Sequence, residues 1–179
     1  MHKEGDALLI QQPVYFPFRE VIEDNGRIFV NNQLHYEDGK YTIDFEDFEK
    51  KIVDNNVKVF ILCNPHNPVG RVWTKEELEK MGDICLKHNV VIMDDEIHCD
   101  FTYPGFKFTS FMTLDKKYHN SLVLYTSPSK TFNVAGLQPA NIIIKNQELR
   151  AAYRKANVAA GYSQGSIMGQ VAVKSVYTK

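Results

Sequence analysis

The chain has 179 residues, of which 44% are hydrophobic and 24% are charged, and its formal net charge is −1. This composition is typical of one soluble globular domain with a sizeable core, and it argues against an intrinsically disordered protein. A nearly neutral chain without a basic run gives no support to nucleic-acid binding or to a polybasic membrane anchor. We therefore expect neither nucleic acid nor a membrane among its partners.

The cysteines and the first residues of the chain indicate the cellular compartment of the protein. Cys63, Cys85 and Cys99 are odd in number, widely spaced and without a CxxC motif, which is typical of reduced thiols inside a cell. No apolar stretch approaches the roughly 20 residues of a membrane helix, and the first six residues show no signal-peptide pattern. The sequence predicts a cytoplasmic protein.

The first part of the chain begins with a short apolar run, Ala7–Ile10, that predicts a buried strand. Two prolines then interrupt an aromatic cluster over 11–18, which predicts a loop that leads into a helix. The helix should end at the turn signal Asp24-Asn25-Gly26. Arg27–Val30 predicts a second strand, and 31–41 a polar connection.

Strands and helices alternate from residue 44 to residue 126. Asp44 can cap one helix, and Thr74 with Glu77 forms a capping box at the start of another. Repeated strand–helix–strand units predict a three-layer α/β/α fold around a mostly parallel mixed sheet. The expected elements are a helix between Asp44 and Asn55, a strand over 57–63, a helix over 74–87, strands over 90–93, 122–126 and 142–144, and helices over 147–157 and 163–177.

Lys130 stands in a polar loop, Ser127–Gln138, directly after the predicted strand Leu122–Thr126. Loops at strand ends are where open α/β sheets bind ligands. Ser127 and Ser129 flank the amine and could hydrogen-bond an anion such as phosphate. The position suits a lysine that forms a Schiff base with a carbonyl group. Taken alone, Lys130 is more simply interpreted as an ordinary solvated lysine.

Two further strand ends carry unusual residues: Asn67 follows the strand over 57–63, and Asp95 and His98 follow the strand over 90–93. The ends of parallel strands lie at one edge of a sheet, so a ligand there would meet these side chains and Lys130 together. Each residue also has a purely structural interpretation. Asn67 could belong to a turn, Asp95 could cap a helix, and His98 could be a satisfied core or surface histidine.

Together these residues match the needs of pyridoxal 5′-phosphate. A carboxylate such as Asp95 at the pyridine nitrogen keeps that nitrogen protonated, so that the ring accepts electrons. A hydrogen-bond donor near the phenolic oxygen of the cofactor tunes the imine, and the serine hydroxyls could hold the phosphate. Tyr15 could stack on the ring.

Four motifs, in this order, carry a resemblance to a known family: Pro13-Val14-Tyr15, Asn67–Gly70, Asp95–His98 and Ser127–Leu137. They resemble the fold-type I aminotransferase superfamily, class I/II. Within it, the chain is most similar to the branch of cystathionine β-lyase, which includes the maltose-regulon modulator type of C–S lyase. The resemblance covers essentially all 179 residues.

The resemblance implies roles for three of these residues. Lys130 matches the lysine that forms the Schiff base with the cofactor. Asp95, and not Asp94, matches the partner of the pyridine nitrogen. Asn67 matches the residue that hydrogen-bonds the phenolic oxygen, whereas Asn64 has no such counterpart.

The remaining positions divide into matches and departures. Tyr15 falls where the family places a ring-stacking aromatic, and Ser127 and Ser129 fall at phosphate-contacting positions. His98 stands where aminotransferases carry a tyrosine, and the lyase branch is similar to this chain in having histidine. Gln138 stands where many aminotransferases carry a phosphate-binding arginine, which weakens the interpretation as an ordinary aminotransferase.

The resemblance also implies that the chain is incomplete. Family members are about twice as long, so residues 1–179 should be the central part of the large, cofactor-binding domain. An N-terminal segment with a phosphate-binding helix start and a C-terminal small domain with a carboxylate-binding arginine are expected to be absent. Arg71, Arg150 and Arg154 do not fall at that arginine position. The family also implies a homodimer.

The expected activity is β-elimination from an amino-acid substrate, cystathionine or another cysteine S-conjugate, which gives a thiol, pyruvate and ammonia, with Lys130 as general base. Three alternatives stay open. The protein could be a class I/II aminotransferase or a catalytically silent fragment that acts through protein contacts. A metal cluster built from the acidic run Asp94–Asp100 would instead suit a hydrolase, although residues so close in sequence rarely converge on one ion. No dinucleotide-binding motif or P-loop is present, and we expect no metal.

Overall fold

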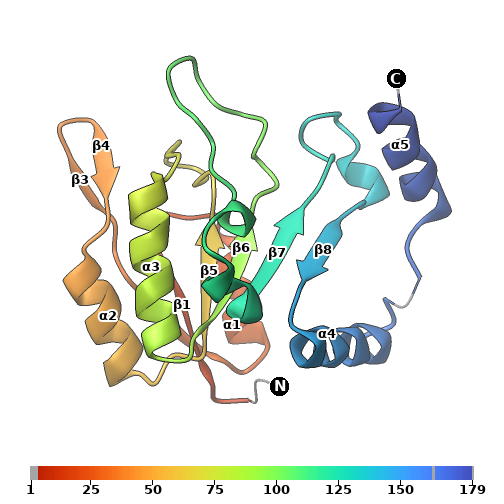
Figure 1. The fold of residues 1–179 in the computed structure, drawn as a ribbon. Helices are drawn as coiled ribbons and strands as arrows, with labels where there is room; N and C mark the ends of the chain where they lie inside the picture. Colours follow the sequence, from red (N-terminus) through yellow and green to blue (C-terminus); the bar gives the residue numbers. More distant parts are fainter. Residues whose placement is uncertain (1–3, 163, 179) are drawn as a thin grey trace.

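A computed structural model of the chain describes residues 4–162 and 164–178, which form a six-stranded sheet with helices on both faces (Figure 1). The strand order is β2-β1-β5-β6-β7-β8; neighbours are parallel except β8, which runs antiparallel to β7. The predicted α/β fold with a mostly parallel mixed sheet is confirmed. The strands are β1 (Ala7–Ile10), β2 (Ile28–Asn31), β5 (Val59–Cys63), β6 (Val91–Asp95), β7 (Leu122–Thr126) and β8 (Asn141–Ile144).

The helices form the outer layers. Helix α1 (Pro17–Asp24) packs on one face of the sheet, and α2 (Phe45–Asp54) and α3 (Lys75–Lys87) pack on the other (Figure 1). Helices α4 (Gln147–Ala159) and α5 (Ile167–Tyr177) follow β8 at the end of the chain. The last helix was expected from Ser163, which lies outside the described residues; α5 begins after its N-cap Ser166. Among the described helices, none is long and apolar enough to cross a membrane.

The predicted helix caps are present. The Asp44 side chain accepts a hydrogen bond from the Asp47 N–H, and Thr74 and Glu77 form the expected capping box. These contacts satisfy backbone N–H groups that a helix start leaves without partners. They fix where α2 and α3 begin, and hence how both helices lie on the sheet.

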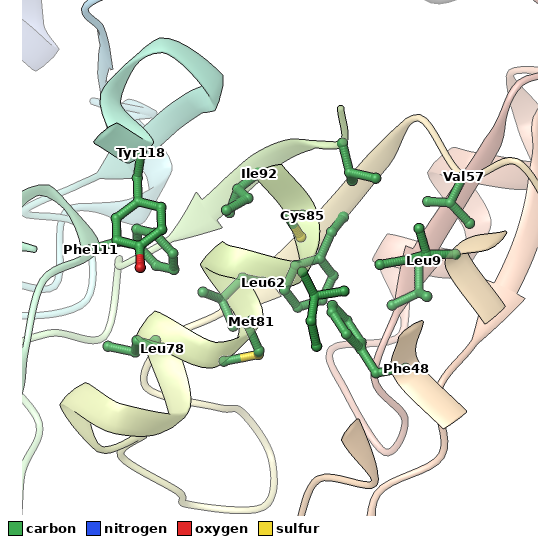
Figure 2. Packing of buried hydrophobic residues seen from close by; sticks show 14 of the residues in the cluster. Leu9, Phe48, Val57, Leu62, Leu78, Met81, Cys85, Ile92, Phe111 and Tyr118 are labelled. Atoms are coloured by element: carbon green, nitrogen blue, oxygen red, sulfur yellow. The ribbon is translucent and has the colours of Figure 1, made fainter. Parts of the chain in front are cut away.

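The larger core lies between the sheet and the α2/α3 layer (Figure 2). Phe48 from α2 packs edge to face on Phe60 from β5 at 5.0 Å between ring centroids, and Phe111 packs on Tyr118 at 5.5 Å. Burying one such side chain contributes roughly 1.5–3 kcal/mol. Strand β5 is buried along its whole length, as expected for a parallel strand covered on both faces.

Residues 31–41 differ from the prediction of a plain polar connection. They contribute to a hairpin of β3 (His35–Glu37) and β4 (Lys40–Thr42), paired antiparallel around Asp38-Gly39. Three short 3₁₀ turns within the described ranges were also not predicted: η1 (Phe111–Thr113), η2 (Lys116–Ser121) and η3 (Ala135–Leu137). None of these elements belongs to the main sheet.

Three neighbouring parallel strands end at the same level. Cys63 on β5 is in register with Asp95 on β6, and Asp95 is in register with Tyr125 on β7. The loops that follow β5, β6 and β7 therefore begin side by side at one edge of the sheet. Ligands of open α/β sheets bind at such an edge.

Candidate active site

Side chains from four segments surround one cavity at this edge of the sheet. The cavity has a volume of about 100 Å³. The loops after β1, β5, β6 and β7 all contribute to it, so the predicted convergence of strand ends is what the fold produces. Its lining residues are Tyr15, Cys63, Pro65, Asn67, Asp95, Ile97, His98 and Lys130.

Lys130 is held by the turn that follows β7. The Phe132 N–H donates to the Pro128 carbonyl at 2.9 Å, and the Val134 N–H donates to the Ser129 carbonyl at 3.0 Å. The neighbouring Thr131 hydroxyl donates to the Asp100 carboxylate at 2.6 Å, which ties this loop to the loop after β6. The Lys130 side chain is exposed yet borders the cavity, so its amine is accessible from solvent.

Asp95 ends strand β6 and points into the cavity. Its Oδ1 accepts a hydrogen bond from the Ile97 N–H at 3.1 Å. Burial raises the pKa of the Asp95 carboxyl, while the Ile97 N–H and the electrostatic influence of His98 and Lys130 lower it. The lysine and this carboxylate thus face the same space, with opposite charges.

The loop after β5 places Asn67 at the cavity wall. The Asn67 N–H donates to the Cys63 sulfur at 3.4 Å, and the Cys63 thiol donates to the Pro65 carbonyl at 3.3 Å. Burial raises the pKa of Cys63 to about 12, so its thiol is protonated and packs as a small hydrophobe. The Trp73 indole N–H closes the loop by donating to the Cys63 carbonyl at 3.0 Å.

His98 borders the cavity beside Asp95 and Lys130. Burial lowers the pKa of the imidazole; Asp95 raises it and Lys130 lowers it further. His98 is therefore neutral at neutral pH and offers one N–H donor and one nitrogen acceptor. Its ring also packs edge to face on Phe101.

The two serines of the loop, Ser127 and Ser129, precede Lys130 but are not among the residues that line the cavity. The Ser127 hydroxyl donates to the Pro139 carbonyl and accepts the Ser129 N–H at 3.0 Å, so it already stabilises the loop. Gln138 is exposed and adopts a left-handed backbone conformation, with φ 54°. Phosphate contacts by Ser127 and Ser129 stay a prediction.

Sequence reasoning missed three residues of the lining: Cys63, Pro65 and Ile97. Cys63 could have been found, because it is the last residue of a fully buried strand whose neighbour ends in Asp95. The Ile97 N–H donates to the Asp95 carboxylate, a backbone contact that no side-chain motif reveals.

The acidic run Asp94–Asp100 does not gather around one point. Asp94 and Glu96 are buried on the η1 side of the sheet, whereas Asp95 borders the cavity on the other side. Successive side chains of a strand point to opposite faces, which separates them. Over the ranges the structure describes, no three His, Cys, Asp or Glu side chains are grouped as metal ligands.

The family model for class I and II aminotransferases matches residues 1–179. The chain belongs to this family. Among curated relatives, cystathionine β-lyase PatB of Bacillus subtilis is 43% identical over 175 residues, which are 98% of this chain and 45% of PatB. The chain thus spans less than half the length of this relative.

Two solved structures are similar to this chain in both fold and sequence. Cystalysin of Treponema denticola, whose crystal structure contains pyridoxal 5′-phosphate, is 42% identical with a TM-score of 0.90, over 93% of this chain and 42% of cystalysin. The pyridoxal-phosphate-bound C–S lyase of Staphylococcus hominis is 35% identical with a TM-score of 0.89, over 99% of this chain and 44% of the lyase. The resemblance expected from the motifs, including the lyase branch, is confirmed.

Proposed function

We propose that the cavity at the ends of β5, β6 and β7 binds pyridoxal 5′-phosphate. The chemistry of the lining fits this cofactor group by group. Lys130 offers an amine for the aldehyde carbon, Asp95 a carboxylate for the pyridine nitrogen, and Asn67 an amide for the phenolic oxygen. Tyr15, 44% exposed at the rim, offers an aromatic face for the ring.

We further propose β-elimination from cysteine S-conjugates, with cleavage of the bond between Cβ and sulfur, for a protein of the relatives' length that contains this chain. When bound, pyridoxal phosphate supplies an electron-accepting ring that weakens the bonds at the substrate Cα. The Lys130 Nζ is the base that removes the Cα proton. Asp95 holds the proton on the ring nitrogen. The Asn67 amide and the neutral His98 imidazole, which border the same cavity, orient the bound cofactor.

The single observation that carries this proposal is that Lys130 and Asp95 border one cavity in a chain 43% identical to a cystathionine β-lyase. His98 supports lyase chemistry over transamination, because the resemblance places a histidine here in the lyase branch. From the same family resemblance we propose amino-acid substrates and a homodimer. A cytoplasmic location is proposed from the thiols of Cys63, Cys85 and Cys99, which are free in the described chain.

A product assay tests the activity. The full-length protein is supplied with cystathionine and pyridoxal phosphate, and pyruvate, ammonia and free thiol are measured. We expect all three in equal amounts, and none from the Lys130→Ala variant. An oxo acid formed only when a second oxo acid is added, without pyruvate or ammonia from cystathionine, would establish transamination instead.

A further inference from the structure

Two carboxyl groups lie buried behind the candidate site and take no part in the proposed chemistry. Asp94 is 0% exposed and Glu96 is 2% exposed, and both side chains point away from the cavity toward η1. Asn64, directly after β5, is also buried, and its backbone N–H donates to the Asp95 carbonyl at 3.0 Å. We call the two acids the Asp94–Glu96 pair. Two charges at such depth would be costly unless each is neutralised or hydrogen-bonded.

The two acids differ sharply in their hydrogen-bond donors. Glu96 Oε1 accepts the Phe111 N–H at 2.8 Å. Neither oxygen of Asp94 receives a well-aligned N–H or O–H from any described residue. The nearby Asn64 amide donates instead to the Thr109 carbonyl at 3.1 Å. Glu96 is therefore the better site for a negative charge.

Asp94 and Glu96 stand two residues apart at the end of β6, so their side chains leave the strand on the same face of the sheet. Carboxylates only accept hydrogen bonds, so a bond between two of them requires that one carries a proton. We propose that Asp94 is a neutral carboxylic acid at neutral pH, that it donates its proton to the Glu96 carboxylate, and that the pair positions the loop beside the active site.

The electrostatic surroundings agree with this assignment. Burial and then Glu96 raise the pKa of Asp94 well above its usual range; Asp95 adds to this and the Asn64 amide opposes it. For Glu96, burial raises the pKa, while the bonds from Asp94, Ser110 and Phe111 lower it. From β5, the Cys63 thiol on the same edge is protonated and brings no charge.

The Asp94–Glu96 pair affects the candidate site because it connects β6 to η1 and so holds the loop between them. Through the Phe111 N–H, Glu96 joins the end of β6 to the start of η1 and closes the segment 97–110. That segment carries His98 and, with Phe101 and Phe106, borders a second cavity of about 220 Å³ next to the first. With its proton in place, Asp94 adds no second negative charge beside Asp95.

A carbon-13 NMR titration of the aspartate and glutamate carboxyl groups tests the proton. In the 179-residue chain we expect one carboxyl carbon that keeps the chemical shift of a protonated acid at neutral pH and is absent in Asp94→Asn. Glu20→Gln, which changes an exposed acid on α1, should leave it in place. The assignment is overturned if every carboxyl group is ionised at neutral pH, or if the protonated signal persists in Asp94→Asn and disappears in Glu96→Gln.

Hydrogen exchange of the amides in 97–110 tests the positioning role. Asp94→Asn keeps a side-chain N–H that can donate to Glu96, so its protection should equal that of the unchanged chain. Asp94→Leu removes the donor, and its amides in this segment should exchange faster, while those of α2, far from the pair, should not change. Equal protection of the amides in 97–110 in Asp94→Leu and in the unchanged chain would overturn the positioning role. If a variant does not fold, the NMR titration of the unchanged chain still reports whether one carboxyl group stays protonated.

Discussion

Cys63 and Asp95 lie opposite each other in the register of the parallel strands β5 and β6. This pairing brings the start of the Asn67 loop to the level of the Asp95 carboxylate. Tyr125 continues the same row on β7, from which the chain runs directly into the Lys130 loop. The candidate site is therefore a property of strand register: a slip between β5 and β6 would separate the residues that border the cavity.

Asp95→Asn should keep the shape of the site but remove its negative charge. An amide cannot hold the ring nitrogen in its protonated state, so we expect turnover of cystathionine by the full-length protein to fall on the order of 10²–10³-fold. Attachment of the cofactor to Lys130 should persist. The control is Asp54→Asn, at the exposed end of α2, which should react like the unchanged protein. Unchanged turnover in Asp95→Asn would contradict the role of this carboxylate.

Gly82→Ala should destabilise the core under α3. A Cβ at this position would lie 2.6 Å from Cε1 of Tyr118 and 3.0 Å from Cζ of Phe111. Since both rings are buried and packed on each other, we expect a loss of about 1–3 kcal/mol in the free energy of unfolding, measured by urea denaturation. Gly136→Ala, where a Cβ meets no atom within 4 Å, is the matched control and should change stability little.

His66 should make the fold sensitive to mild acid. Burial lowers the pKa of its imidazole to about 4, whereas the imidazole of an unfolded chain has a pKa near the ordinary value of 6.5. The unfolded chain thus binds more protons between these pH values, and the free energy of unfolding should fall as the pH falls through this window, by up to ~3 kcal/mol in total.

The measurement is urea denaturation at several pH values for the unchanged chain and for His66→Phe. The difference between the two should shrink from neutral pH toward pH ~4, because the variant has no imidazole to protonate. His35→Gln, which changes an exposed histidine on β3, should follow the unchanged chain. Parallel pH profiles for His66→Phe and the unchanged chain would rule out this origin.

Thr74→Ala should weaken the start of α3. The Thr74 hydroxyl accepts the Glu77 N–H at 3.2 Å, and the Glu77 carboxylate accepts the Thr74 N–H at 2.8 Å. Loss of the cap should cost about 1 kcal/mol in the free energy of unfolding. Thr74→Ser, which keeps the hydroxyl, should recover most of it; if serine and alanine cost the same, the cap contributes nothing measurable.

Much of the fold follows from local patterns. The buried runs predict the strands of the main sheet, and Asp44 and Thr74 mark the helix starts, because caps and apolar runs are encoded within a few residues. The hairpin of β3 and β4 was missed because its residues are largely exposed and show no apolar alternation. The Asp38-Gly39 pair, with both φ values positive at 48° and 77°, was a usable turn signal.

The candidate site was predicted in part. Tyr15, Asn67, Asp95, His98 and Lys130 meet at one cavity, because loops after parallel strands share an edge of the sheet. The orientation of Asp94 and Glu96 away from that cavity required the strand register, which pairs residues distant in sequence. The hydroxyl contacts of Ser127 likewise depend on how its loop closes on Pro139, a contact that no local pattern shows.

The most direct test of the central claim is reductive labelling of the 179-residue chain with pyridoxal phosphate and borohydride, followed by digestion and mass spectrometry. We predict a covalent label on Lys130 and no labelled peptide at this position in Lys130→Ala. Lys145→Ala, a change after β8 away from the cavity, should label like the unchanged chain. A label spread over many exposed lysines without preference for Lys130, or no label at all, would contradict a cofactor site in this chain.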